Sequence, residues 1–423
     1  MRRRDFLQIA GAASACTLLP AFAASDDLTI SEVDVLKLTG THEIVPGLNR
    51  QYQVQPLHVY GERRPKPFKD PAEPRSEKRP LTHYYVRIRT KGGAEGIYGL
   101  VDKEALPVLL GTLRPLVIGQ NALAVERIWD QMYRSNRHAR ASHFMMAISY
   151  IDNALWDLRG RVFGSPVYRL LGGPTQMPVR VYGSCLGFSI DPPLAAKRAA
   201  QLKKDGFVHQ KWFLGYGPGD GARGMELNVE LVKSLREAVG DDVQIMFDAY
   251  QGWDLPYALE WCRKVEQYRP FFLEEAFLMA DVESFIRLAR STSVPIATGE
   301  HLYGRWEAEQ FFKMDALQFM QADPEWCGGV SETVKIAHLC SVHGVQLLPH
   351  CHNVHAALHI VASQPPAVCP FGEYLINYVP EKLHFIKDPP LTSNGLVQLS
   401  DKPGFGIELD PAKVEKQEVL TTP

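Results

Sequence analysis

The chain has 423 residues, of which 45% are hydrophobic, and it carries 46 basic against 48 acidic side chains. This length can bury a large core, most simply in two domains. The formal charge of −2 provides neither the basic field that binds nucleic acid nor a bias toward membranes, so the expected partner is a small molecule.

The first 23 residues have the pattern of an export signal. The pair Arg3-Arg4 is followed by an apolar run over residues 9–23, which ends in the small-x-small cleavage pattern AFA. This composition is typical of a twin-arginine signal peptide. We therefore expect residues 1–23 to be removed and the mature protein to be periplasmic. The alternative is an apolar N-terminal helix that stays attached.

Residues 24–175 are expected to fold as a first, α+β domain. Strand-like alternation covers segments 31–40 and 83–93. The Pro- and charge-rich stretch between them, 63–80, is predicted to be an extended loop because it is too polar to bury. Residues 105–171 have helical periodicity, and a Gly-Gly-Pro sequence ends this pattern.

From residue 176 to 398 the pattern changes to short apolar runs that alternate with amphipathic stretches. Eight runs are strand candidates: 179–185, 207–214, 243–248, 271–275, 294–298, 317–321, 345–349 and 371–376. Parallel strands require crossover helices between them, so this alternation predicts β-α units that form a barrel. The tail, 399–423, is loop-like in composition and is expected to pack back on the first domain.

A polar residue ends or closely follows five successive runs: Asp248, Glu274, Glu300, Asp323 and His350. The steps between them are 26, 26, 23 and 27 residues. The carboxyl ends of parallel barrel strands open into one mouth, where active sites of such barrels lie. We therefore expect these five side chains to converge on one small volume.

The three carboxylates Asp248, Glu274 and Glu300 predict a metal site. Without a cation, like charges this close would raise one another's pKa values and destabilise the fold. Hard oxygen ligands favour Mg²⁺, or Mn²⁺ in its place, over zinc. The alternative is three separately solvated loop acids. Glu275 adjoins Glu274, and because successive strand side chains point to opposite faces, only one of the two should face the metal.

Four residues are candidate catalytic groups. A carboxylate bonded to one imidazole nitrogen raises the basicity of the other, so Asp323 and His350 predict a general base; the alternative is a structural histidine. Lys211, which closes the second run, can neutralise a substrate carboxylate or polarise an oxygen; the alternative is a surface lysine without a role. Glu373, on the last run, can donate a proton or hydrogen bond to an enolic oxygen. Together these groups suit proton abstraction next to a carboxylate.

Residues 151–173, IDNALWDLRGRVFGSPVYRLLGG, resemble the hallmark helix of the mandelate racemase and muconate-lactonising group of the enolase superfamily. Within that group, the segments KWFLGYGPGDG, GEHLYG, DPEWCGG and DKPGFGIEL are most similar to L-rhamnonate dehydratase and related acid-sugar dehydratases. The resemblance covers essentially the whole mature chain. It implies an α/β fold, with a (β/α)7β TIM-like barrel and an α+β capping domain, in a homo-oligomer. It also implies metal ligands at Asp248, Glu274 and Glu300, an Asp323–His350 dyad, and an acid-side residue at Glu373.

One departure from the group bears on the reaction. In its racemases the second strand ends in Lys-x-Lys, and the second lysine is a base on the opposite face of the substrate. Here the sequence Lys211-Trp212-Phe213 places Phe213 at that position. A 1,1-proton transfer needs bases on both faces, so racemisation is disfavoured, whereas β-elimination needs one base and one acid.

The capping-loop segment, residues 53–65, also differs from the rhamnonate enzymes, so the identity of the sugar acid stays open. His58 in this segment and His301 are the candidate substrate contacts. The predicted reaction is a Mg²⁺-dependent dehydration, in which α-proton abstraction, a metal-stabilised enediolate and β-elimination of water give a 2-keto-3-deoxy acid. Two alternatives stay open: a racemase, epimerase or cycloisomerase of the same superfamily, and a non-catalytic exported sugar-acid binding protein.

Overall fold

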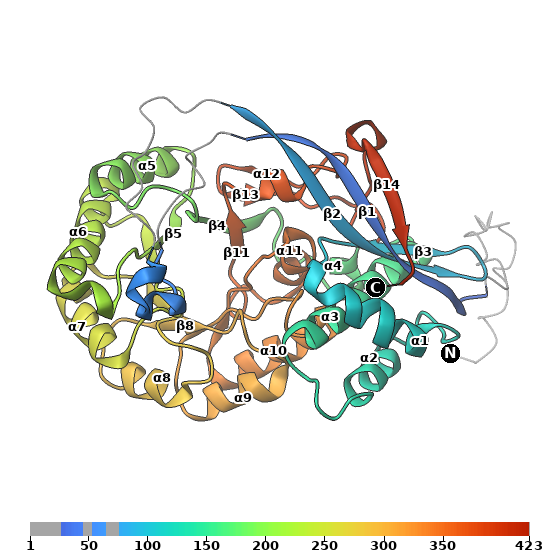
Figure 1. The fold of residues 1–423 in the computed structure, drawn as a ribbon, viewed down its shortest axis with the longest axis horizontal. Coiled ribbons are helices and arrows are strands. Elements are labelled where there is room, and N and C mark those ends of the chain that lie inside the picture. The colour runs from blue at the N-terminus through green and yellow to red at the C-terminus, as the bar shows by residue number, and fades with distance from the viewer. Residues whose placement is uncertain (1–26, 45–52, 65–75, 423) are drawn as a thin grey trace, which may run out of the picture.

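An antiparallel sheet of four strands forms one side of the computed structural model, which describes residues 27–44, 53–64 and 76–422 (Figure 1). The strand order is β14-β1-β2-β3, with β1 at Ile30–Ile44, β2 at Glu77–Thr90, β3 at Glu95–Tyr98 and β14 at Lys416–Leu420. Apolar side chains of these strands, such as Val33 and Val35, are fully buried. The sheet belongs to the capping domain.

The hairpin of β1 and β2 is longer than the sequence predicts. Residues 77–80 belong to the predicted loop, but they pair with residues 41–44 of β1. Their side chains are exposed, so their polarity excludes burial but not strand pairing, which backbone hydrogen bonds make. The loop prediction is therefore wrong at this end, and residues 65–75 of the same stretch lie outside the described residues.

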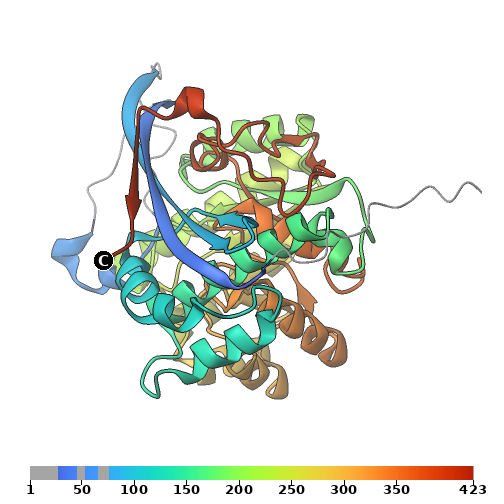
Figure 2. The same cartoon turned by 90° about the vertical axis from the view of Figure 1, so that its right-hand side faces the viewer.

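Two helices of the capping domain, α3 and α1, contact this sheet, and the others pack on helices, as Figure 2 shows from the side. They are α1 at Arg114–Val117, α2 at Val125–Arg134, α3 at Ser142–Val162 and α4 at Val167–Leu170. Short turns of helix precede them: η1 at Pro56–Val59, η2 at Gly61–Arg63, η3 at Lys103–Ala105 and η4 at Pro107–Leu113. Most side chains of α3 are buried, because this helix contacts both the sheet and the second domain.

Polar side chains of α3 dock onto the start of α10 (Gly329–His343) in the second domain. The first N–H groups of a helix have no partner within that helix. Here Asp152 Oδ2 accepts a hydrogen bond from the N–H of Ser331 at 2.9 Å, and Asn153 Oδ1 accepts one from the N–H of Val330 at 2.9 Å. The hallmark helix therefore caps a helix of the other domain and joins the two.

Eight parallel strands form the second domain, a barrel with the order β11-β4-β5-β6-β7-β8-β9-β10. Their bounds are Val179–Ser184 (β4), His209–Phe213 (β5), Gln244–Asp248 (β6), Phe272–Glu274 (β7), Ile296–Thr298 (β8), Phe319–Met320 (β9), Gln346–Leu347 (β10) and Gly372–Leu375 (β11). The N–H of Glu373 donates to Pro349 O at 3.4 Å, which brings the two end strands together. Each predicted run contains one strand, and the predicted fold is confirmed.

Helices surround these strands in the ribbon view (Figure 1). They are α5 at Pro192–Lys204, α6 at Gly221–Val239, α7 at Leu255–Val265, α8 at Val282–Ala289, α9 at Arg305–Lys313, α10, α11 at Val354–Ser363 and α12 at Val379–Lys382. A hairpin of β12 (Thr392–Ser393) and β13 (Leu396–Val397) then pairs antiparallel with β4. None of the helices in the described part of the chain combines the length and apolar character that a membrane span needs.

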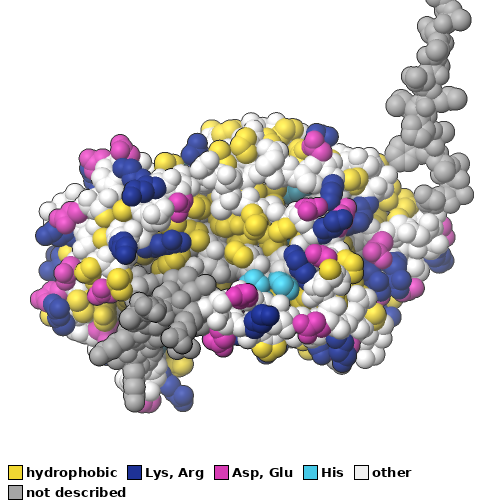
Figure 3. All heavy atoms as spheres, turned by 90° about the horizontal axis from the view of Figure 1, so that it is seen from above, with side chains coloured by type: hydrophobic (Ala, Val, Ile, Leu, Met, Phe, Trp, Pro, Cys, Tyr) yellow, Lys and Arg dark blue, Asp and Glu magenta, His cyan; other side chains and the backbone are white. Residues whose placement is uncertain are grey.

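After the barrel the chain returns to the capping domain. β14 pairs with β1 from Val35↔Leu420 to Thr39↔Lys416. The six cysteines outside the first 26 residues are all buried thiols. On the face that Figure 3 shows, Lys and Arg side chains are interspersed with Asp and Glu, in keeping with the near-neutral charge of the chain.

Candidate active site

The strand period of two decides which side chains reach the mouth of the barrel. A layer of apolar side chains fills the interior: Tyr182, Met246, Phe272, Ala297, Phe319, Leu348 and Phe371. Four of these residues, Met246, Phe272, Leu348 and Phe371, are each followed two positions later by a polar residue. These polar residues are Asp248, Glu274, His350 and Glu373. Because side chains two apart share a face, these four point into the same interior nearer its carboxyl end, and all are buried.

Lys211 of β5 lies at the centre of this polar layer. Its Nζ is 2.6 Å from Glu274 Oε1, 3.0 Å from Glu373 Oε1 and 3.4 Å from Asp248 Oδ2. Burial lowers the pKa of Lys211, but the carboxylates outweigh burial and hold it well above its ordinary value. For Glu373, burial raises the pKa, while Lys211 and His350 lower it, on balance to about 2. Lys211 is therefore a cation and Glu373 an anion at neutral pH.

One lysine does not neutralise the other carboxylates. Burial raises the pKa of Asp248 to about 7 and that of Glu274 to about 8, although Lys211 opposes both shifts. Burial likewise raises the pKa of Glu300 to about 7. The Oε2 atom of Glu274 is buried and has no hydrogen-bond partner among the described residues. Buried carboxylates of this kind, with an oxygen left unpaired, fit a divalent cation that prefers oxygen ligands.

Glu300 reaches the mouth through a glycine turn. Gly299, directly after β8, has a φ of +122°, and a Cβ there would lie 2.4 Å from the sulfur of Met320. Only glycine fits such a backbone and such a close approach. Oε2 of Glu300 then lies 3.7 Å from Nε2 of His350, so this carboxylate faces the histidine that the sequence predicts as the base.

Glu275 also lines the mouth. Its φ of +42° ends the strand alternation after Glu274, so the rule of opposite faces does not apply to this pair. The Glu275 carboxylate lies 2.9 Å from His301 Nδ1 and accepts a hydrogen bond from Gln251 Nε2 at 3.0 Å. Among the described residues, the side chains whose ligand atoms all lie within 4.8 Å of one another are Glu275, Glu300 and His301, a set that shares only Glu300 with the predicted metal ligands. In the sequence, the adjacent pair Glu274-Glu275 marks this site, but the spacing of the strands does not show which of the two faces a metal.

Asp323 and His350 are in direct contact. Nδ1 of His350 lies 2.5 Å from Oδ2 of Asp323, whose Oδ1 accepts a hydrogen bond from the N–H of Glu325 at 2.6 Å. Nε2 of His350 faces Glu373 at 3.5 Å as well as Glu300. Burial lowers the pKa of His350, but Glu300, Glu373 and Asp323 raise it, on balance to about 10. The imidazole therefore turns Nε2 toward the carboxylates and holds a proton there.

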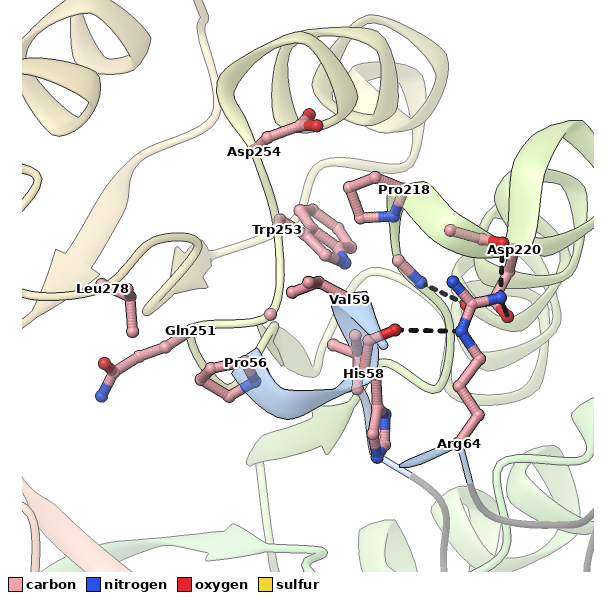
Figure 4. A pocket seen from close by; sticks show the side chains of 14 residues that line it. Pro56, His58, Val59, Arg64, Pro218, Asp220, Gln251, Trp253, Asp254 and Leu278 are labelled. Carbon is pink, nitrogen blue, oxygen red and sulfur yellow. Dashed lines mark hydrogen bonds and ion pairs between the residues drawn. The ribbon is translucent and has the colours of Figure 1, made fainter. Parts of the chain in front are cut away.

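His58 lies in a pocket beside this group of residues rather than within it. The pocket has a volume of about 300 Å³ and lies where η1 covers the turn at 217–220 and the loop that carries Trp253 (Figure 4). Arg64 donates from Nε to His58 O at 3.0 Å and holds the segment on the turn. Within the described residues, no hydrogen bond or ion pair joins the His58 ring to the carboxylates. Gln251 lines the pocket and contacts Glu275, so the two spaces adjoin.

Two family profiles match the two domains separately. Residues 62–172 match the mandelate racemase / muconate lactonizing enzyme N-terminal domain, and residues 194–413 match the enolase C-terminal domain-like family. The chain belongs to the mandelate racemase and muconate-lactonizing group of the enolase superfamily. The resemblance that the sequence motifs indicate is thereby confirmed.

Individual members of the superfamily align over most of the chain. The L-rhamnonate dehydratase of Saccharopolyspora erythraea is 32% identical over 331 residues, which cover 76% of this chain and 79% of that protein. The rhamnonate dehydratase of Gibberella zeae complexed with Mg superposes with a TM-score of 0.78 at 27% identity, covering 93% of this chain and 97% of that one. The 3,6-anhydro-D-galactonate cycloisomerase of Zobellia galactanivorans superposes with a TM-score of 0.72 at 24% identity over 92% of this chain and 100% of that one, which shows the shared fold alone.

Proposed function

We propose that this member of the enolase superfamily is a sugar-acid dehydratase that acts on an aldonate of the L-rhamnonate kind. The observation that carries the proposal is the His350–Asp323 pair at the mouth, opposite a phenylalanine in place of a second lysine base. His350 turns its Nε2 toward the carboxylates, whereas the buried ring of Phe213, 5.4 Å from Lys211 Nζ, stands where a racemase of the group has its second base. One base and one acid suit β-elimination. The similarity to L-rhamnonate dehydratases supports the same substrate class.

In this proposal the proton movements fall to His350. With the charge of Glu300 neutralised by a bound cation, the pKa of His350 would fall from its metal-free value of about 10. The imidazole, then neutral, would take the proton on C2 at Nε2, while Asp323 holds Nδ1 so that only Nε2 exchanges the proton. The electrons of the C2–H bond form a C2=C3 double bond as the C3–O bond breaks. The departing hydroxyl takes the proton from His350 and leaves as water, and the resulting enol rearranges to a 2-keto-3-deoxy acid. Lys211 provides a fixed positive charge for the substrate carboxylate. Glu373, which is ionised at neutral pH rather than the proton donor that the sequence predicts, would accept a hydrogen bond from an enolic hydroxyl.

We further propose that Asp248, Glu274 and Glu300 hold Mg²⁺. When bound, the cation would stabilise the negative charge that develops on the substrate carboxylate. The Mg complex of the Gibberella zeae relative supports this choice, and Mn²⁺ should substitute because it accepts the same oxygen ligands. Activity should disappear with EDTA and return with Mg²⁺ or Mn²⁺. An enzyme that is indifferent to the chelator would contradict the proposal.

The reaction is tested with a panel of aldonates and aldarates, in which 2-keto-3-deoxy products are detected and exchange at C2 is followed in D₂O. We expect one or a few aldonates to lose water. Exchange with inversion at C2 but without loss of water would instead show a racemase or epimerase. Tight binding of a sugar acid without exchange or product would show a binding protein.

We also propose that the protein is exported by the twin-arginine route. The proposal rests on the Arg3-Arg4 pair and the apolar run after it, which lie outside the described residues. Replacing both arginines with lysine keeps the charge but should leave the precursor in the cytoplasm, as cell fractionation and the size of the chain would show. An unchanged periplasmic yield would make the pair incidental.

A further inference from the structure

An indole ring covers the predicted base. Trp326 lies in the turn after β9, three residues beyond Asp323, and its ring stacks on that of His350 with centroids 4.9 Å apart and planes 30° apart. The same indole stacks on His301 at 5.4 Å and 28°. The bond from His350 to Asp323 fixes one edge of the imidazole but not its rotation about that bond. A stacked ring restrains that rotation, and the packing confines both rings.

A carboxylate of the capping domain holds this indole. Asp102 lies between β3 and η3, and its Oδ2 accepts hydrogen bonds from Trp326 Nε1 at 3.3 Å and from the Tyr150 hydroxyl at 2.9 Å. Its Oδ1 lies 3.4 Å from His352 Nε2. Burial raises the pKa of Asp102, but the hydrogen bonds from His352, Tyr150 and Trp326 lower it, on balance to about 2. The carboxylate is therefore ionised at any pH at which the enzyme would work.

Asp102 reaches the dyad along a second route as well. The N–H of His352 donates to Asp323 Oδ2 at 2.8 Å, and this is the oxygen that also bonds His350. One carboxylate from the capping domain thus contacts the residue that stacks on His350 and the residue that holds Asp323. Neither contact belongs to the metal ligands or to the residues that would exchange a proton.

We propose that Asp102 and Trp326 are positioning residues, which align His350 only while the capping domain is docked on the barrel. The inference rests on the proposed function, because it takes His350 to be the base. Its physical basis is the steep dependence of proton transfer on geometry: a misplacement of about 1 Å can lower a rate by about 10²-fold. The capping domain would then contribute to the chemical step itself.

The test compares Trp326→Phe, which keeps a stacking face but not the Nε1 donor, with Trp326→Leu, which keeps neither. We expect kcat to fall by about 10²-fold in Trp326→Leu and by less in Trp326→Phe, with KM nearly unchanged, because an interaction that aligns the base acts in the transition state. Asp102→Asn should lower kcat about as much as Trp326→Phe. In the double variant Asp102→Asn/Trp326→Phe the combined loss should be smaller than the product of the two single losses, because Asp102→Asn weakens the hydrogen bond that Trp326→Phe removes.

Two matched controls remove similar groups elsewhere. Trp306→Leu removes an indole that stacks on Tyr133 at 4.8 Å and is 46% exposed. Asp401→Asn removes a carboxylate that accepts a hydrogen bond from the Tyr168 hydroxyl at 2.6 Å. Both controls should keep the wild-type kcat, and calorimetric titration should give the wild-type Mg²⁺ affinity for every variant.

Three results would overturn the positioning role: a wild-type kcat in both Trp326 variants, a loss carried by KM, or fully multiplicative losses in the double variant. If Trp326→Leu fails to fold, Trp326→Phe and Asp102→Asn still decide between these outcomes. If the wild type dehydrates no sugar acid, the proposed function fails, but crystal structures still test the alignment. An imidazole of His350 that keeps its contacts with Asp323, Glu300 and Glu373 in the variants would then exclude the positioning role.

Discussion

The Asp323 carboxylate decides which nitrogen of His350 exchanges the proton, and this makes asparagine an informative replacement for the histidine. His350→Asn keeps a similar shape and a hydrogen-bonding end but cannot take a proton at neutral pH. We expect kcat to fall by about 10²–10⁴-fold, the usual contribution of a general base, or by more if His350 also delivers the proton to the hydroxyl. Calorimetry should show metal and sugar-acid binding retained. The control is His138→Asn at an exposed position, which should keep the wild-type kcat. Near-normal turnover of His350→Asn would show that His350 is not the base.

Lys211 is expected to be as important for stability as for the substrate. Replacing it with Met keeps the length of the side chain but leaves Glu274 and Glu373 buried without their cation. Removing one partner of a buried ion pair costs about 3–5 kcal/mol of unfolding free energy, whereas an exposed pair contributes about 0–1 kcal/mol. The control is Lys233→Met, because the exposed ammonium of Lys233 is 3.8 Å from Glu237. Urea unfolding in EDTA at pH 8 should therefore show a much larger loss of unfolding free energy for Lys211→Met than for Lys233→Met. Equal losses in the two variants would contradict this account.

Single residues were predictable from the sequence where the strand period of two holds. It brings Asp248 and Glu274, whose spacing predicts this, to one side of the apolar layer together with Glu373 of the last strand. The rule ends where the strand ends, so it could not assign Glu275, whose left-handed backbone turns it toward His301. The strand period also could not predict where His58 lies, because this residue belongs to a loop of the capping domain that is not paired with the barrel strands.

At the scale of elements, three strand ends each contribute one carboxylate to the proposed metal site. Metal-free Asp248, Glu274 and Glu300 have pKa values of about 7 to 8 in the fold, above their ordinary values of about 4. Between about pH 4 and pH 8 the folded chain therefore binds more protons than the unfolded chain, and these groups make the metal-free fold less stable as pH rises. Mg²⁺ binds the ionised carboxylates. It must therefore displace protons from them at a pH below their pKa values, but not at a pH above these values.

The Mg²⁺-induced rise in Tm should consequently be larger at pH 8 than at pH 5.5. Differential scanning fluorimetry with EDTA or with a fixed excess of Mg²⁺ measures it at both values. Glu300→Gln should lose most of the rise at pH 8, while the exposed Asp242→Asn should keep it. A rise of the same size at both pH values would show that the metal does not compete with protons for these carboxylates.

The elements that sequence patterns predicted are those that bury apolar residues. Each of the eight apolar runs contains a barrel strand, because hydrophobic burial and strand formation coincide there. The first part of β2 and the whole of β14 were not predicted as strands, since their side chains are largely exposed and their pairing partners lie on β1, far away in the sequence for β14. The contact of α3 with α10 likewise joins helices whose periodicity says nothing about partners.

For the molecule as a whole, the chain ties its two domains together at more than one place. β14 adds a strand to the capping sheet after the barrel is complete, and α3 caps α10. The buried Asp157 of α3 accepts hydrogen bonds from the N–H of Ile97 at 2.9 Å and from the N–H of Phe405 in the tail at 2.8 Å, and it pairs with Arg161. Domains joined in this way should unfold together rather than one at a time.

Asp157→Ala tests this coupling. The substitution leaves two buried N–H groups without an acceptor, and since each such group costs about 1–3 kcal/mol, the unfolding free energy should fall by roughly 2–6 kcal/mol. The lost contacts join β3, α3 and the tail. Hydrogen exchange followed by mass spectrometry should therefore show that peptides from both domains open at the same denaturant concentration, which is lower than in the wild type. Asp130→Ala, which removes an exposed pair with Arg134, should change neither domain. Two separate transitions, with the barrel unaffected, would show that the capping domain and the barrel are independent folding units.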